Sequence, residues 1–209
     1  MPIFDLSLYL VTDRRLSLGR SLEEVVEEAV KGGVTMVQLR EKDCSTLDFY
    51  QLSVRMKQLL APYKVPLIIN DRLDIAIACN ADGVHIGQSD MPYDVARQML
   101  GYDKIIGLSI ETLEQAKLAN ALDVDYIGIS PIFSTPTKTD TLLPFGIEGI
   151  QQVKQICKHK AVAIGGIHAN NAAAIYNAGA DGIAVVSEIM SATNPFEAAH
   201  ILRTELNKY

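Results

Sequence analysis

The residues of this chain that could do chemistry follow short apolar runs. Gln38, Arg40 and Lys42 alternate at the end of one run, so an extended chain would place an amide and two cations on one side. This combination suits a diphosphate, because two cations and an amide donor would face its oxygens together. The alternative is a solvated strand exit whose charge is partly neutralised by Glu41.

Two carboxylates follow the next two apolar runs. Asn70 and Asp71 come after Ile69, and Asp90 comes four residues after Ile86. Carboxylates on neighbouring loops beside cations could share Mg²⁺, which takes one or two carboxylates together with water and substrate phosphates. An isolated aspartate more often caps a turn or a helix, and that remains the competing interpretation. The nearby Lys and Arg side chains favour the metal.

Later strand ends carry groups suited to an anion. An apolar run ending at Ile129 continues into hydroxyls, prolines and Lys138, an order that a packed core does not need. The pair Gly165-Gly166 follows another run, and glycine backbone N–H groups can approach a phosphate without obstruction from a Cβ atom. Val186 and Ser187 occupy the equivalent position after the last run.

Elements that would position these residues can be predicted from the alternation of two periods. Eight short apolar, β-branched runs predict buried parallel strands, at Leu8–Thr12, Met36–Arg40, Leu67–Asn70, Val84–Ile86, Ile105–Ser109, Tyr126–Ile129, Ala161–Ile164 and Ile183–Val186. Helical patterns lie between them, at Ser21–Gly32, Ser45–Leu60, Asp74–Cys79, Tyr93–Leu100, Thr112–Ala121, Ile147–Lys158, Asn171–Ala178 and Pro195–Lys208. Ser21 and Glu24 form a capping box that opens the first helix.

This alternation predicts an α/β fold, a (β/α)₈ TIM barrel formed by residues 1–209 as one domain. A doubly wound open sheet also alternates strand and helix, but the turn after the first strand, residues 12–15, lacks a glycine fingerprint for a dinucleotide. In a barrel the loops at the carboxyl ends of the strands share one rim. Residues far apart in sequence would therefore converge on a single site.

The amino-acid composition limits the classes of molecule that this chain is expected to bind. The net charge of −6 makes nucleic acid and acidic membranes poor partners, whereas local Lys and Arg would have to attract phosphorylated small molecules. No apolar run approaches the length of a membrane span, and the first residues do not predict a secretory signal. The 3 cysteines are not closely paired, so we expect free thiols and a cytoplasmic protein. A homo-oligomer is compatible with the sequence.

Five stretches together resemble the thiamine-phosphate synthase family, and the likeness runs from about Tyr9 to the end of the chain. The stretches are residues 38–42 (QLREK), 69–72 (INDR), 83–90 (GVHIGQSD), 135–140 (TPTKTD) and 163–167 (AIGGI). The resemblance implies a TIM barrel that joins hydroxymethylpyrimidine diphosphate to a thiazole phosphate and releases pyrophosphate. With a carboxylated thiazole as the acceptor, CO₂ is also lost.

The resemblance also implies roles for individual residues. The pyrimidine diphosphate would be held by Gln38, Arg40, Lys42, Asn70, Ser109 and Lys138, with Leu39 and Glu41 in the same stretch. Mg²⁺ would lie on Asp71 and Asp90. The thiazole phosphate would be held by Thr135, Pro136, Thr137, Gly166, Val186 and Ser187. The catalytic residues would be Arg40, Lys42, Lys138 and Ser109, beside which Glu111 and Ser130 depart from the family pattern.

The implied chemistry is a dissociative substitution. The bond that breaks joins a CH₂ group to a diphosphate oxygen, and the electron-rich aminopyrimidine can support a carbocation. The protein would stabilise the leaving diphosphate and align the thiazole nitrogen, and no general base is needed for bond cleavage. Two alternatives remain: a thiazole tautomerase on a related barrel, which needs no diphosphate site, and a non-catalytic sensor of phosphorylated metabolites.

Overall fold

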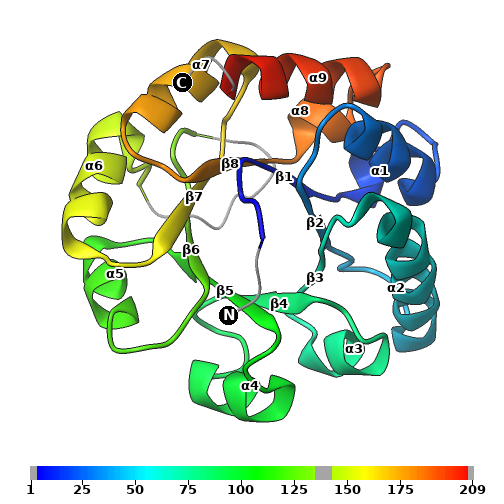
Figure 1. The fold of residues 1–209 in the computed structure, drawn as a ribbon, viewed down its shortest axis with the longest axis horizontal. Coiled ribbons are helices and arrows are strands. Elements are labelled where there is room, and N and C mark those ends of the chain that lie inside the picture. The colour runs from blue at the N-terminus through cyan, green and yellow to red at the C-terminus, as the bar shows by residue number, and fades with distance from the viewer. Residues whose placement is uncertain (1–3, 135–142, 207–209) are drawn as a thin grey trace.

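Eight parallel strands close into a barrel, and the helices form a ring around it (Figure 1). The computed structural model of the protein describes residues 4–134 and 143–206. Every strand pairs with its neighbours in chain order, and β8 closes on β1 with Leu8 beside Ile183. This is the TIM barrel that the alternation of strands and helices predicts.

The strands are short, as expected for a barrel. They are β1 (Leu8–Val11), β2 (Met36–Leu39), β3 (Leu67–Asn70), β4 (Gly83–Ile86), β5 (Ile105–Ile110), β6 (Tyr126–Ile129), β7 (Lys160–Ile164) and β8 (Gly182–Val185). The described helices are α1 (Leu22–Lys31), α2 (Thr46–Leu60), α3 (Leu73–Ala78), α4 (Tyr93–Leu100), α5 (Leu113–Ala119), α6 (Gly146–Ile156), α7 (Ala169–Asn177), α8 (Ser187–Met190) and α9 (Pro195–Leu206). Two 3₁₀ turns cover Arg14–Leu16 and Ala61–Tyr63.

Strand residues alternate between two apolar cores. In β2, Val37 and Leu39 belong to the large core between the barrel and its helices, whereas Met36 packs inside the barrel. The interior core also contains Tyr9 and Tyr126, neither of which is exposed to solvent. Side chains with the parity of Met36 therefore point inward, and those nearest the carboxyl ends of the strands reach the rim.

Helix starts follow from side-chain caps. The predicted capping box of α1 is confirmed: Glu24 N–H donates to Ser21 Oγ at 3.2 Å, and Ser21 N–H donates to Glu24 Oε2 at 2.9 Å. Helix α7 begins two residues earlier than predicted, because His168 takes the N-cap position and its N–H donates to Asn171 Oδ1. The short helix α8 was not predicted, since four residues carry no readable period.

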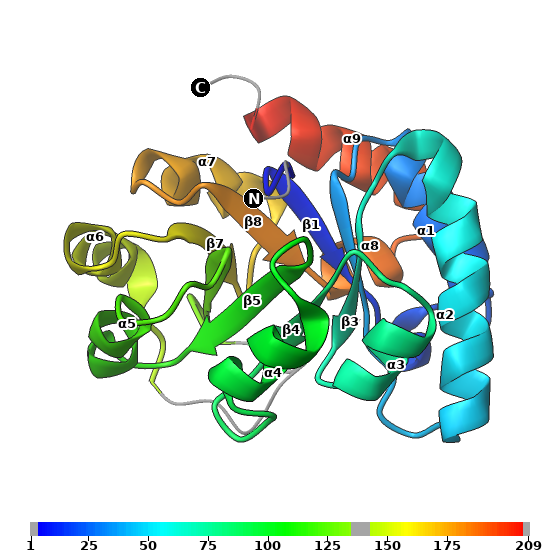
Figure 2. The same ribbon diagram turned by 60° about the horizontal axis from the view of Figure 1, so that its bottom comes forward.

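The chain from Phe4 enters at the end of the barrel where the strands begin (Figure 2). There the Phe4 ring lies 6.1 Å from the ring of Tyr126, and Lys160 at the start of β7 lies over it. Phe4 therefore packs against the interior core at the end where the strands begin. Among the described helices, none has the length and apolar character needed to cross a membrane.

Candidate active site

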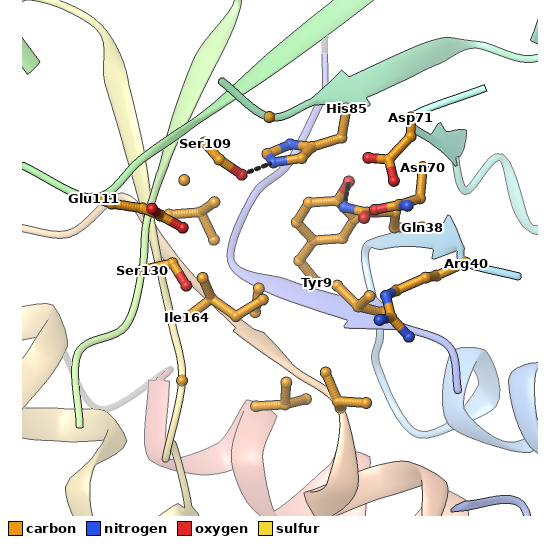
Figure 3. A pocket seen from close by; sticks show the side chains of 18 of the residues that line it. Tyr9, Gln38, Arg40, Asn70, Asp71, His85, Ser109, Glu111, Ser130 and Ile164 are labelled. Atoms are coloured by element: carbon orange, nitrogen blue, oxygen red, sulfur yellow. Dashed lines mark hydrogen bonds between the residues drawn. The ribbon is translucent and has the colours of Figure 1, made fainter. Parts of the chain in front are cut away.

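A cavity of about 570 Å³ opens at the carboxyl ends of the strands and is lined by residues from all eight strands and from their loops. Figure 3 shows it from close by. Gln38, Arg40 and Lys42 all line it, as do Asn70 and Ser109. The strand β2 ends at Leu39, one residue before the predicted end at Arg40. The strand and the loop after it still direct all three predicted side chains to one cavity.

Arg40 is held at the rim by the loop that follows β1. Its Nη1 donates to Asp13 Oδ2 at 3.2 Å, and its backbone N–H donates to Thr12 Oγ1 at 3.0 Å. Sequence reasoning gave Asp13 no role, because an aspartate after a strand normally reads as a turn residue. Here Asp13 also caps a 3₁₀ turn and fixes the side chain that points toward the cavity.

Leu39 and Glu41 lie outside the lining of the cavity, although the family resemblance includes them in the substrate-binding stretch. Leu39 is fully buried in the core between the barrel and its helices. The side chain of Glu41 is 5% exposed and pairs with Arg14 Nη2 at 3.0 Å. A period of two sends these side chains away from the residues on either side of them.

Asp71 lies against Lys42 in a backbone conformation that non-glycine residues seldom adopt. Lys42 Nζ donates to Asp71 Oδ2 at 2.6 Å, and φ of Asp71 is +60°. The backbone N–H of Asp71 donates to the carbonyl of His85 at 2.9 Å, which holds the residue in place. Strained conformations of this kind gather at functional sites, where the surrounding structure must fix a side chain.

Asp71 and Asp90 are close enough to interact directly. Burial would raise the pKa of Asp71, but hydrogen bonds from Lys42 and Asp90 outweigh it and lower that pKa. Burial raises the pKa of Asp90; the N–H of Gly87, 2.6 Å from Asp90 Oδ2, opposes the rise, and the Asp71 carboxylate adds to it. Two facing carboxylates create a position where positive charge is favoured.

The donor set of this pair fits Mg²⁺. Both side chains offer hard carboxylate oxygens, and the cavity beside them has room for water and phosphate oxygens. Within residues 4–134 and 143–206, no group of three or more His, Cys, Asp or Glu side chains is placed to hold a metal. A cation at Asp71 and Asp90 would therefore need ligands from water and substrate, as Mg²⁺ usually does.

Ser109 and His85 lie on neighbouring strands and meet at the floor of the cavity. His85 Nε2 and Ser109 Oγ are 2.8 Å apart, and Figure 3 shows the ring of His85 turned toward Ser109. The His85 side chain is largely buried, because the residue is only 9% exposed. The loop after β4 is tied to the same strand, because Gln88 Nε2 donates to the carbonyl of Ser109 at 2.7 Å.

Across the cavity from Arg40, Lys42 and the two aspartates, the wall is formed by two glycines and the start of α8. Gly165 and Gly166 have φ values of +105° and +64°, and a Cβ atom on Gly166 would lie 2.8 Å from Phe133 Cβ. Val186 and Ser187 line the same side, where Ser187 begins α8. A short helix and a glycine loop after strands seven and eight are the usual phosphate site of this fold.

Four predicted residues, Thr135, Pro136, Thr137 and Lys138, lie outside the described residues. Among residues without a predicted role, Tyr9 and Glu111 also line the cavity. The sequence signal for Tyr9 was its position two residues before Val11 in the same strand, because residues two apart face the same side of a strand and Val11 also lines the cavity. The cavity thus has a cationic and carboxylate side, a polar floor and a glycine side, an arrangement suited to a ligand with phosphates at two ends.

Comparison with known proteins gives consistent matches. A sequence model described as "Thiamine monophosphate synthase" matches residues 8–189. The thiamine-phosphate synthase of Albidiferax ferrireducens is 55% identical over 198 residues, which cover 95% of this chain and 90% of the relative. That of Leptospira biflexa is 50% identical over 202 residues, covering 95% of this chain and 96% of the relative. The solved thiamine phosphate pyrophosphorylase of Pyrococcus furiosus superposes with a TM-score of 0.89 at 37% identity, covering 97% of this chain and 96% of that one.

Proposed function

This chain belongs to the thiamine monophosphate synthase family, and we propose that the barrel-end cavity is where it carries out the family's reaction. It is an enzyme that transfers a pyrimidinylmethyl group: it joins hydroxymethylpyrimidine diphosphate to a thiazole phosphate and yields thiamine phosphate and pyrophosphate. The observation that supports this cavity is the convergence of Arg40, Lys42, Asp71 and Asp90 opposite the glycine pair Gly165-Gly166.

Arg40 and Lys42 stabilise the negative charge of the departing diphosphate. Both line the cavity, and both are held by carboxylates that limit their range of positions. A cation about 4 Å from an anion, at an effective dielectric constant of about 20, contributes roughly 4 kcal/mol before desolvation. We assign Lys138 the same role from its place in the family pattern; it lies outside the described residues.

Asp71 and Asp90 would hold Mg²⁺ beside the same diphosphate. When bound, the cation neutralises charge on the diphosphate oxygens and so makes pyrophosphate a better leaving group. The fixed loop geometry supports this role: Asp90 is anchored by the N–H of Gly87 and Asp71 by the carbonyl of His85. These contacts keep both carboxylates at the rim rather than in solvent.

Gln38, Asn70 and Ser109 hold the pyrimidine, and Gly166, Val186 and Ser187 hold the thiazole phosphate. Thr135, Pro136 and Thr137, from a stretch outside the described residues, complete the phosphate end. The two ends lie on opposite sides of one cavity, so the thiazole nitrogen can be aligned with the CH₂ carbon as the C–O bond breaks. We propose a dissociative path, in which alignment and charge stabilisation replace a general base.

The cationic and carboxylate side of the cavity favours a synthase over a thiazole tautomerase, which needs a single phosphate site.

We place the enzyme in the cytoplasm, because Cys44, Cys79 and Cys157 are all free thiols, as a reducing compartment would keep them.

The test is incubation of the purified protein with both substrates and Mg²⁺. We expect thiamine phosphate and pyrophosphate in equal amounts, measured by mass spectrometry and a coupled phosphate assay. Omission of the thiazole should suppress both products. Binding of the pyrimidine diphosphate with no product after long incubation would indicate a sensor, and would reject the proposal.

A further inference from the structure

Five polar side chains form a continuous hydrogen-bonded chain under the floor of the cavity. Gln38 Nε2 donates to Tyr9 Oη at 2.9 Å, and Tyr9 Oη lies 2.8 Å from Tyr126 Oη. Tyr126 Oη lies 2.9 Å from His85 Nδ1, and His85 Nε2 lies 2.8 Å from Ser109 Oγ. The chain crosses the barrel from β2 to β5, and both of its ends line the cavity.

The interior of the barrel is shaped around this chain. A Cβ atom on Gly107 would lie 2.1 Å from Tyr126 Cζ and 2.5 Å from His85 Nδ1. A Cβ atom on Gly128 would lie 3.2 Å from His85 Cε1. The glycines therefore leave the space in which the Tyr126 hydroxyl and the imidazole meet. Tyr9 and Tyr126 are fully buried, so each must find partners for its hydroxyl within the protein.

The donor at Gln38 sets the direction of every other bond. Tyr9 Oη accepts from the amide, so its own proton is available for Tyr126. Tyr126 then gives its proton to His85 Nδ1, which leaves the imidazole proton on Nε2. Nε2–H donates to Ser109 Oγ, and the Ser109 proton turns away from the histidine. In this direction each buried proton of the chain has an acceptor.

We propose that Tyr9, Tyr126 and His85 are positioning residues that fix the Nε2–H tautomer of His85 and turn the hydroxyl proton of Ser109 into the cavity. The inference rests on the proposed function, since the cavity is taken as the pyrimidine site. Ser109 would then present a donor to a ring nitrogen, and Gln38, with its amide nitrogen directed at Tyr9, would present its carbonyl oxygen to an amino group. This is the pattern that an aminopyrimidine edge matches.

The tautomer can be observed directly in the wild-type protein. With ¹⁵N-labelled histidine, two-bond proton–nitrogen correlations distinguish the Nε2–H from the Nδ1–H form, and loss of one signal set in His85→Gln assigns His85 among the 4 histidines. We expect a single Nε2–H tautomer. An Nδ1–H tautomer would overturn the proposal, because every bond of the chain would then run in reverse: the Gln38 amide would be turned over, and the Ser109 hydroxyl would donate its proton to His85 Nε2.

Kinetics test whether this direction matters for the reaction. Tyr126→Phe keeps the ring and removes the hydroxyl, so we expect averaging of the two His85 tautomers and a kcat lower by about tenfold or more, as for the loss of one buried hydrogen bond. The KM for the thiazole phosphate should stay within about twofold, because Tyr126 does not line the cavity and its hydroxyl contacts only Tyr9 and His85 among the bonds described above. The matched control is Tyr93→Phe, which removes a hydroxyl that accepts from Arg97 on α4, outside the cavity.

The outcomes separate this inference from the proposed function. An active wild-type enzyme with a fixed Nε2–H tautomer, together with reduced kcat and a mixed tautomer in folded Tyr126→Phe, supports both. Wild-type activity in Tyr126→Phe, or an Nδ1–H tautomer in an active wild type, overturns the inference alone. If Tyr126→Phe does not fold, the same two measurements, the His85 tautomer and kcat, are made on Tyr9→Phe, and the tautomer of the wild-type protein is still decisive. A wild type that forms no thiamine phosphate rejects the proposed function.

Discussion

Lys42 Nζ lies 2.6 Å from Asp71 Oδ2, although the two residues are 29 positions apart and come from different strand ends. The contact joins a cation that we assign to the diphosphate with a carboxylate that we assign to Mg²⁺. Substrate and cation would each compete for one member of this pair. The pair thus keeps both side chains in the cavity until their ligands arrive.

Arg40→Met should lower kcat by about a hundredfold or more, because a preorganised cation that faces transition-state charge contributes on that scale. The measurement is steady-state pyrophosphate release. The matched control is Arg14→Met in the adjacent ion pair, whose partner Glu41 lies outside the cavity lining. It should retain wild-type kcat, and equal losses in the two variants would argue against a specific role for Arg40.

Asp71→Asn should raise the Mg²⁺ concentration needed for half-maximal activity by about tenfold or more, because one of two carboxylate ligands becomes neutral. A titration of activity with MgCl₂ after chelator treatment measures this. Asp74→Asn is the control: Asp74 pairs with Arg72 and lies outside the cavity. Full activity of the wild type after removal of divalent cations would rule out the metal site.

Gly166→Ala should raise the KM for the thiazole phosphate more than the KM for the pyrimidine diphosphate. Its φ of +64° strains any side chain, and the new Cβ would lie 2.8 Å from Phe133 Cβ beside the phosphate end. Gly101→Ala is a matched control for strain, since its φ is +78° and no atom lies within 4 Å of the new Cβ. Similar KM changes in both variants would point to general destabilisation.

Gly107→Ala should lower the free energy of unfolding by about 2 kcal/mol or more, because overpacking a filled interior forces neighbouring side chains to shift. Urea unfolding followed by circular dichroism measures the change. In Gly128→Ala the new Cβ would meet the His85 ring alone, with Cε1 at 3.2 Å and Nε2 at 3.6 Å, so this change should cost less. If the order of the two costs were reversed, the packing described around Tyr126 would be wrong.

The sequence was sufficient to predict the barrel and much of the rim, because each depends on local features. Apolar runs identify strands, and the last residue of a run or the residue after it reaches the shared edge. Arg40 and Asp71 could be chosen on this basis, whereas Ser109 was assigned from the family resemblance; all three line the cavity. The same parity sends Leu39 and Glu41 outward, which was overlooked because the family stretch includes them.

The contacts across the barrel could not be predicted in the same way. The partnership of Asp13 with Arg40 depends on how two loops fold over the rim. The chain through Tyr9 and Tyr126 joins residues 117 positions apart, and a tyrosine in an apolar strand gives no indication of the partner of its hydroxyl. Glycine at 107 becomes informative only when the neighbouring side chains are placed.

The most direct test of the shared site is a crystal structure of the enzyme with Mg²⁺, pyrophosphate and thiamine phosphate. We predict pyrophosphate in contact with Arg40 and Lys42, Mg²⁺ on Asp71 and Asp90, and the product phosphate against Gly166 in the same cavity. Pyrophosphate bound elsewhere on the protein, or a cation that avoids both carboxylates, would contradict the account.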